Sequence, residues 1–258
     1  MIHLKTPDEI SVIAKGGAII AGLFGEVEGC VVPGANTRDL DVFCDEYIRA
    51  HAGAEPAFKG LYGFTGSVCT SINEEVVHGI PSPDRRLALG DIISIDVGVK
   101  LDGWCSDSAW TFAVGDVDAE TQHLLAVTEQ ALEAAIEAAT SGNHVGDIGA
   151  AVMSVVSGTG FGIIADLVGH GVGRVVHEEP QVPNLGQPGV GPLLRAGMVL
   201  AIEPMISLGS DQIRTLDDRW TVVTADGTRA AHFEHTVAVT ESSPRVLTVA
   251  AEGVVSPT

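Results

Sequence analysis

Cysteines, basic residues and aromatic residues are all scarce in this chain of 258 residues. The four cysteines are scattered and form no CxxC pair, which argues against a disulfide framework and against a structural zinc site built on thiolates. Only 14 lysines and arginines stand against 34 aspartates and glutamates, giving a formal net charge of −20. This excess of negative charge argues against a nucleic-acid partner and favours the attraction of divalent cations.

Long apolar runs are also missing. No stretch of about 18 uninterrupted apolar residues occurs, so we expect no membrane-spanning helix. The first ten residues, MIHLKTPDEI, lack the basic and then apolar order of a secretory signal. We therefore expect a cytoplasmic protein with reduced thiols. With 45% apolar residues, the chain is long enough to bury a large core, and we expect a single domain over residues 1–258.

Helical patterns occur in two pairs along the chain. A capping box at Thr6, with proline at the first helical position, begins a predicted helix over about residues 6–28. Apolar spacing predicts a second helix over about 37–53. The other pair is expected at about 118–139, where Asp118 is the capping residue, and at about 144–157.

Two aspartates lie on a predicted β-hairpin between these pairs of helices. Asp96 follows the apolar run 92–95, and Asp107 lies on the extended run 104–114. Residues 100–103 between them have turn chemistry. A carboxylate at the core end of an apolar strand is costly unless a cation or a set of hydrogen-bond donors compensates for lost water. Because two such groups would also repel each other, the hairpin indicates a metal site.

A second core strand, 198–202, delivers Glu203 in the same way that the first strand delivers Asp96. This parallel in element order predicts an α+β fold with two pseudo-symmetric halves, about 1–117 and 118–250. Helices would cover a curved antiparallel sheet, and a cleft between the halves would be the natural place for a site.

Five side chains form the candidate metal site: Asp96, Asp107, His170, Glu203 and Glu234. Two divalent ions would balance the charge of these four carboxylates. Oxygen ligands with one imidazole suit Mn, Fe, Co or Zn, and such a pair of ions activates water and stabilises a tetrahedral oxyanion. Any acidic chain offers many such sets. Three of these residues, however, lie in or beside apolar, strand-like runs, where an unpaired charge is unfavourable.

Six separated motifs resemble those of type I methionine aminopeptidases, and they occur in the family order between about residues 5 and 240. They are SINEEVVHGIP (71–81), IDV (95–97) with Asp107, GHGVG (169–173), HEEP (177–180), IEPM (202–205) and FEHT (233–236). The resemblance implies the pita-bread fold and removal of the initiator methionine by metal-assisted hydrolysis, with small second residues preferred. Only 33 positions separate His170 from Glu203, without the inserted subdomain of type II enzymes. Neither the N-terminal domain of longer relatives nor a zinc-binding extension is expected.

The resemblance also implies a role for each candidate ligand. Asp96 would chelate one of two divalent ions, while Asp107 and Glu234 would bridge both. His170 and Glu203 would complete the second set of ligands, and Glu203 would also pass a proton to the leaving amine. The native metal is left open among Co, Mn, Fe, Zn and Ni.

Substrate contacts are implied in the same way. His78 and His177 match the family histidines beside the scissile bond, where imidazole hydrogen-bonds the peptide or its oxyanion. Family methionine-pocket positions fall at Phe58, Leu61, Phe64, Cys69, Val176 and Trp220. Ordinary core packing remains the alternative for Phe58, Leu61 and Val176. The other histidines are interpreted as surface or core residues: His3, His51, His123, His144 and His232.

Two alternative functions stay open. An Xaa-Pro peptidase of the same fold would cleave before proline, and a binding module without catalysis would lack metal. All five ligand positions are filled here, which argues against the binding module. We expect a monomer that acts on nascent polypeptides beginning with methionine, with no nucleic-acid or membrane partner. Docking at the ribosome is left open.

Overall fold

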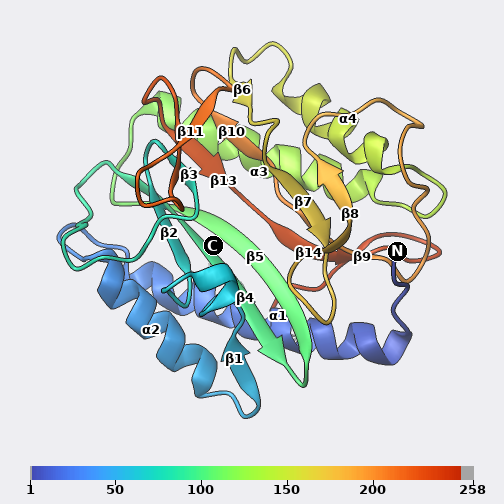
Figure 1. Cartoon of the computed structure of the whole chain (residues 1–258). Coiled ribbons are helices and arrows are strands. Elements are labelled where there is room, and N and C mark those ends of the chain that lie inside the picture. Colours follow the sequence, from blue (N-terminus) through green and yellow to red (C-terminus); the bar gives the residue numbers. More distant parts are fainter. Residues whose placement is uncertain (1, 251–258) are drawn as a thin grey trace.

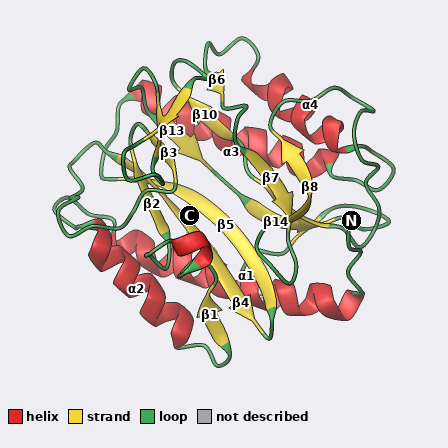
Figure 2. Ribbon diagram, in the orientation of Figure 1, coloured by secondary structure: helices red, strands yellow, loops and turns green. Residues whose placement is uncertain are grey.

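The structure, a computed structural model, describes residues 2–250 and places helices around antiparallel strands (Figure 1). The helical segments are α1 (Pro7–Val27), η1 (Glu28–Cys30), α2 (Thr37–Arg49), η2 (Leu61–Gly63), α3 (Ala119–Ala138) and α4 (Val145–Val156). The strands are β1 (Ala54–Pro56), β2 (Cys69–Ile72), β3 (Glu75–Val77), β4 (Ile92–Leu101), β5 (Trp104–Ala113), β6 (Gly162–Ile163), β7 (Val168–Gly171), β8 (Glu178–Pro183), β9 (Val199–Ile202), β10 (Met205–Ser207), β11 (Ile213–Thr215), β12 (Val222–Thr224), β13 (Ala230–His232), β14 (His235–Ala238) and β15 (Arg245–Val246). Helix α1 lies beside β4 and β5, α2 lies beside α1 and β1, and α3 and α4 lie together beside the later strands (Figure 2).

The predicted helices are all present, and capping residues mark where they begin. Thr6 accepts a hydrogen bond from the Glu9 N–H at 3.3 Å, and the Glu9 carboxylate accepts one from the Thr6 N–H at 2.9 Å. Asp118 caps α3 by accepting a hydrogen bond from the Thr121 N–H at 2.7 Å. Helix α2 ends at Arg49, a few residues before its predicted end.

The segment Pro7–Cys30, formed by α1 and η1, is long and apolar enough to cross a membrane by length and composition, although polar residues interrupt its apolar ones. In the fold, Ile13, Ile20 and Leu23 on this helix are fully buried, and the helix packs against β4 and β5. The hydroxyl of Ser106 on β5 donates to the Ile13 carbonyl at 2.6 Å. Packing on the sheet therefore accounts for the apolar character of α1.

The predicted hairpin is present as β4 and β5, which pair along their whole length. Asp96 lies opposite Ala109, and Asp107 lies opposite Gly98. Since residues two apart on a strand share a face, the two aspartates are diagonal neighbours on one face rather than direct partners. Gly98, opposite Asp107, lets the Phe58 ring pack against the strand, because a Cβ there would lie 2.5 Å from that ring.

Two neighbouring extended segments, residues 199–207 and 230–238, are each interrupted by two residues, and the two interruptions lie side by side. Glu203-Pro204 separates β9 from β10, and Phe233-Glu234 separates β13 from β14. On either side of this break, β14 pairs with β9 and β13 pairs with β10, in two different sheets. Residues 230–238 therefore do not form one continuous strand. Because each segment passes from one sheet to the other at its interruption, Glu203 and Glu234 both lie outside the regular strand pairing.

Hydrogen bonds attach β5 to β14 and so join the aspartate hairpin to this break. The Thr236 hydroxyl accepts from the Asp107 N–H at 3.0 Å and donates to the Asp107 carbonyl at 2.7 Å. The Glu234 N–H donates to the Ala109 carbonyl at 2.9 Å. The Ser108 hydroxyl donates to the Glu234 carbonyl at 2.5 Å. This seam brings Asp107 and Glu234 together although they are far apart in the sequence.

Replacing Thr236 with valine should lower the free energy of unfolding by roughly 1–3 kcal/mol, because valine keeps the shape but leaves buried backbone groups of Asp107 unpaired. Thr236 is fully buried. Urea denaturation of the chelator-treated protein measures the loss. The Thr236→Ser variant, which keeps the hydroxyl, should lose less. A valine variant as stable as the original chain would contradict the stabilising role of this seam.

Candidate metal centre

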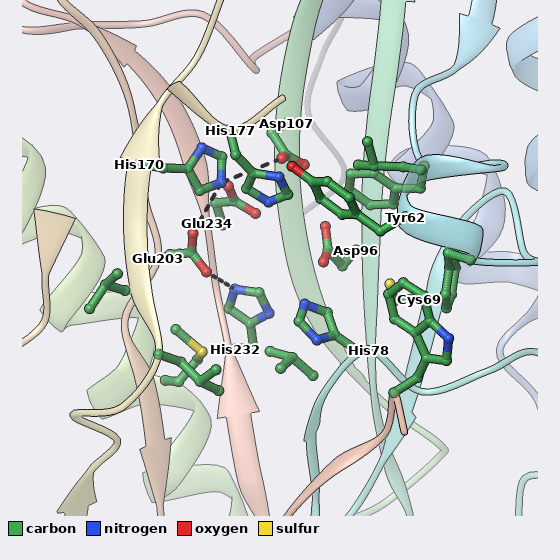
Figure 3. Close-up of a pocket in the computed structure, with 18 residues that line it drawn as sticks. Tyr62, Cys69, His78, Asp96, Asp107, His170, His177, Glu203, His232 and Glu234 are labelled. Atoms are coloured by element: carbon green, nitrogen blue, oxygen red, sulfur yellow. Dashed lines mark ion pairs between the residues drawn. The ribbon is translucent and has the colours of Figure 1, made fainter. Parts of the chain in front are cut away.

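One pocket opens where the hairpin meets the break between strands, and it contains all five predicted metal ligands (Figure 3). Asp96 comes from β4, Asp107 from β5 and His170 from β7. Glu203 and Glu234 come from the interrupted strands. The pocket is also lined by every residue predicted to contact substrate except Val176: Phe58, Leu61, Phe64, Cys69, His78, His177 and Trp220.

Asp107, His170 and Glu234 form the tightest group, each offering a ligand atom within 4.8 Å of the others. His170 Nε2 lies 3.8 Å from Asp107 Oδ2 and 3.5 Å from Glu203 Oε1. His170 Nδ1 lies 3.0 Å from the Gly171 carbonyl oxygen, which orients the ring with Nε2 toward the carboxylates. The pairing of β7 with β8 shifts register between His170 and Gly171, an irregularity that aims the side chain into the pocket.

Several oxygens of this cluster lack a partner. One carboxylate oxygen from each of Asp96, Asp107 and Glu234 is buried without a hydrogen bond to any part of the chain that the structure describes. Leaving a buried polar group unpaired costs about 1–3 kcal/mol, and more for a charged one. A divalent cation satisfies several oxygens at once, and carboxylates with one imidazole are a suitable ligand set. The residues present therefore fit a metal.

Burial raises the pKa of all four carboxyl groups. It raises the pKa of Asp96 and that of Glu203 to about 7 each. For Asp107 and Glu234, burial and then repulsion from neighbouring carboxylates raise the pKa well above its usual range. Without a cation, these groups retain protons at a pH where exposed carboxyls have lost them. Protons and metal ions therefore compete for the same oxygens.

The two predicted substrate histidines differ in exposure. His78 directly follows β3 with φ of 61°, a backbone conformation rare outside glycine and often found at functional sites. Burial lowers the pKa of His78 to about 4, so its imidazole is neutral near pH 7. His177 is exposed and stacks on Tyr62, with ring centroids 6.0 Å apart.

Six residues that line this pocket were not predicted from the sequence, and two of them, Tyr62 and His232, have ring side chains with polar atoms. Tyr62 is 77% exposed and lines the pocket beside His177. His232, interpreted as an ordinary surface or core residue, is buried but lines the pocket, with Nε2 3.6 Å from Glu203 Oε2. Its position two residues before Glu234 was the available signal, since such residues share a face of a strand. Val176 is buried in a core cluster and does not line the pocket, so the core alternative holds for it.

Residues 11–241 match the profile of metallopeptidase family M24. The chain belongs to this family. It is 48% identical to the methionine aminopeptidase of Clostridium perfringens, over 96% of this chain and 99% of that protein. It is 47% identical to methionine aminopeptidase 1 of Bacillus subtilis, over the same shares of the two chains. The predicted resemblance to type I methionine aminopeptidases is thus confirmed, and membership of M24 implies the use of divalent metal.

Solved structures confirm the predicted α+β pita-bread fold of this M24 chain. The crystal structure of methionine aminopeptidase from Thermotoga maritima matches with a TM-score of 0.94 at 44% identity, covering 96% of this chain and 100% of that one. The prolidase of Pyrococcus horikoshii matches with a TM-score of 0.78 at 22% identity, covering 98% of this chain and 65% of that one. The second likeness shows the fold alone.

The metal-free protein should become less stable as the pH rises from about 6.5 to about 8. Below this range the buried His78 and His235, whose pKa is lowered to about 4, give the opposite slope, because unfolding lets them gain protons. Unfolded aspartate and glutamate lose their protons near pH 4, whereas Asp96 and Glu203 in the folded chain have a pKa of about 7. The folded state therefore binds more protons in this range, so raising the pH favours unfolding. Scanning calorimetry after metal removal should show Tm falling with pH, and Mn²⁺ should restore Tm at the high end. A Tm that rises across this range without metal would contradict the carboxyl cluster.

Proposed function

We propose that this M24 peptidase removes the initiator methionine from new polypeptides in the cytoplasm and prefers small second residues. The observation that carries this proposal is an apolar slot directly beside the carboxylate cluster. Cys69 on β2 lies opposite Asp96 on β4, so the slot and the proposed metal site share a strand pair. All four cysteines are free, as expected in a reducing compartment.

The slot suits a thioether side chain. The Phe64 and Trp220 rings meet edge to face with centroids 5.1 Å apart, and the Cys69 thiol lies in the same lining. Thioethers make favourable contacts with aromatic rings, which supports a preference for methionine. The exposed Tyr62 and His177 stack at this pocket, so a bulky second residue would crowd against them.

Two divalent ions would be held by the five predicted ligands. Asp96 would bind one ion, and Asp107 and Glu234 would bind both. His170 and Glu203 would bind the other. When bound, such ions supply Lewis acidity that activates water and stabilises negative charge on a peptide oxygen. The charge of the four carboxylates and the unpartnered oxygens of Asp96, Asp107 and Glu234 support a pair of ions rather than one.

The side chains of this protein would then orient the substrate and move a proton. Glu203 would accept a proton from the attacking water and return it to the leaving amine. His78, a neutral imidazole beside Trp220, would hydrogen-bond the peptide and orient the scissile bond. His177 would contact the peptide from the exposed side of the pocket. No residue here needs to form a covalent intermediate.

Release of methionine from the peptide Met-Ala-Ser tests the proposed activity. Activity should vanish after chelation and return with Co²⁺ or Mn²⁺. Replacing alanine with leucine in the peptide should lower kcat/KM at least about tenfold, because the larger side chain fits the crowded mouth poorly. Failure to release methionine with any metal, by a folded protein, would contradict the proposal. An Ala-Pro peptide run in parallel tests the alternative of an Xaa-Pro peptidase.

Replacing Asp107 with alanine should remove bound metal and lower kcat/KM by at least about 10³, since a proposed ligand of both ions is lost. Metal content by mass spectrometry and peptide cleavage measure the two effects. The matched control is Asp102→Ala, an exposed aspartate in the turn of the same hairpin. Near-normal activity of the Asp107 variant would rule out the two-metal mechanism.

A further inference from the structure

His232 carries a buried imidazole that lines the pocket. Only 2% of the residue is exposed, and neither ring nitrogen has a hydrogen-bond partner among the described residues. Buried polar groups in native proteins nearly always have such partners, or they mark a functional site. His232 belongs to neither the five proposed metal ligands nor the two proposed substrate histidines.

The backbone of His232 is held firmly, so its ring has a defined direction. Its N–H donates to the Thr111 hydroxyl at 3.0 Å, and that hydroxyl donates to the His232 carbonyl at 2.8 Å. Ser94 lies 2.8 Å from the same hydroxyl and extends the network. On its other side, β13 pairs with β10, where His232 lies opposite Met205. A rigid strand therefore presents this ring to the pocket.

The ring lies beside Glu203, between it and His78 (Figure 3). His232 Nε2 is 3.6 Å from Glu203 Oε2, while His170 Nε2 is 3.5 Å from Glu203 Oε1. Each oxygen of this carboxylate therefore faces a different imidazole. Asn184 donates to the Glu203 backbone carbonyl at 3.1 Å, so it does not hold the carboxylate itself.

A direct role as a metal ligand fits His232 less well. In the part of the chain that the structure describes, three ligand atoms lie within 4.8 Å of one another only at Asp107, His170 and Glu234. His232 is not in that group, but its Nε2 lies 3.6 Å from Glu203 Oε2, a few tenths of an ångström beyond hydrogen-bond distance.

We propose that His232 is a positioning residue, whose Nε2–H donates a hydrogen bond to Glu203 Oε2. This bond holds Oε2 in place and leaves Oε1 directed toward His170 and the metal. Such outer partners of a ligand typically contribute 10–100-fold, roughly, to metal affinity or activity. The inference rests on the proposed metal site, but it adds a residue outside its ligand set.

The test compares two substitutions of His232 in the full chain. His232→Leu removes the donor at similar volume, whereas His232→Gln places an amide nitrogen near the position of Nε2. Calorimetric titration of the metal-free proteins with Mn²⁺ gives affinity and stoichiometry, and the visible spectrum with Co²⁺ reports the number of ligands. The control is His123→Leu, which removes an exposed imidazole on α3. Circular dichroism and Tm verify that each variant is folded.

We expect His232→Leu to bind the same number of ions about 10–100-fold more weakly, with the intensity of the Co²⁺ bands preserved. His232→Gln should recover most of the lost affinity, and His123→Leu should match the original chain. Loss of one ion with altered Co²⁺ bands would make His232 a ligand and overturn the proposal. Unchanged affinity in His232→Leu would also overturn it, as would a folded His232→Gln that binds as weakly as the leucine variant.

These measurements separate this proposal from the proposed activity. Metal titration does not depend on cleavage, so a protein that shows the expected affinities but releases no methionine would contradict the activity alone. A protein that releases methionine but shows no effect of His232→Leu on metal affinity would contradict the role of His232 alone. An original chain that binds no Mn²⁺ or Co²⁺ would overturn both.

Discussion

Repulsion among four carboxylates in one pocket is the constraint on which this structure depends. Two unit charges about 4 Å apart repel by about 4 kcal/mol at an effective dielectric constant near 20. A typical hydrogen bond adds a net of only about 1 kcal/mol. The bonds of the seam between β5 and β14 cannot by themselves offset several such repulsions. Protons or divalent cations must do so, and membership of a metallopeptidase family is consistent with cations.

Irregular backbone supplies most of the site, while regular sheet supplies its support. Glu203 and Glu234 lie where two paired strands are interrupted, and His170 lies at a shift of register. His78 has a left-handed backbone conformation. Each irregularity frees a side chain from the alternation of a strand and directs it into the pocket. Regular pairing of β4 with β5, by contrast, is what places Asp96 diagonal to Asp107.

The pocket has a charged side and an apolar side, and each serves a different step of the proposed reaction. The charged side would bind metal and move a proton, whereas the apolar side would select the first residue of the substrate. Cys69 and Asp96 are register partners across β2 and β4, so the two sides are fixed relative to each other by one strand pair. A rigid connection of this kind favours accurate placement of the scissile bond.

The sequence alone determined those features that depend on neighbours along the chain. Capping residues at Thr6 and Asp118 predicted where α1 and α3 begin, and turn residues predicted the hairpin of Asp96 and Asp107. Motif resemblance then indicated the five ligands. Local patterns carry this information because caps, turns and strand alternation act over a few residues.

Tertiary structure decided what depends on contacts between distant segments. The break near residue 233 exists because β13 and β14 pair with different partners, and no local pattern encodes that choice. His232 reaches Glu203 only through the pairing of β13 with β10, and Tyr62 reaches His177 across more than one hundred residues of sequence. Which strands pair, and in which register, is set by burial of the whole core, so these neighbours could not be predicted from their own surroundings in the sequence.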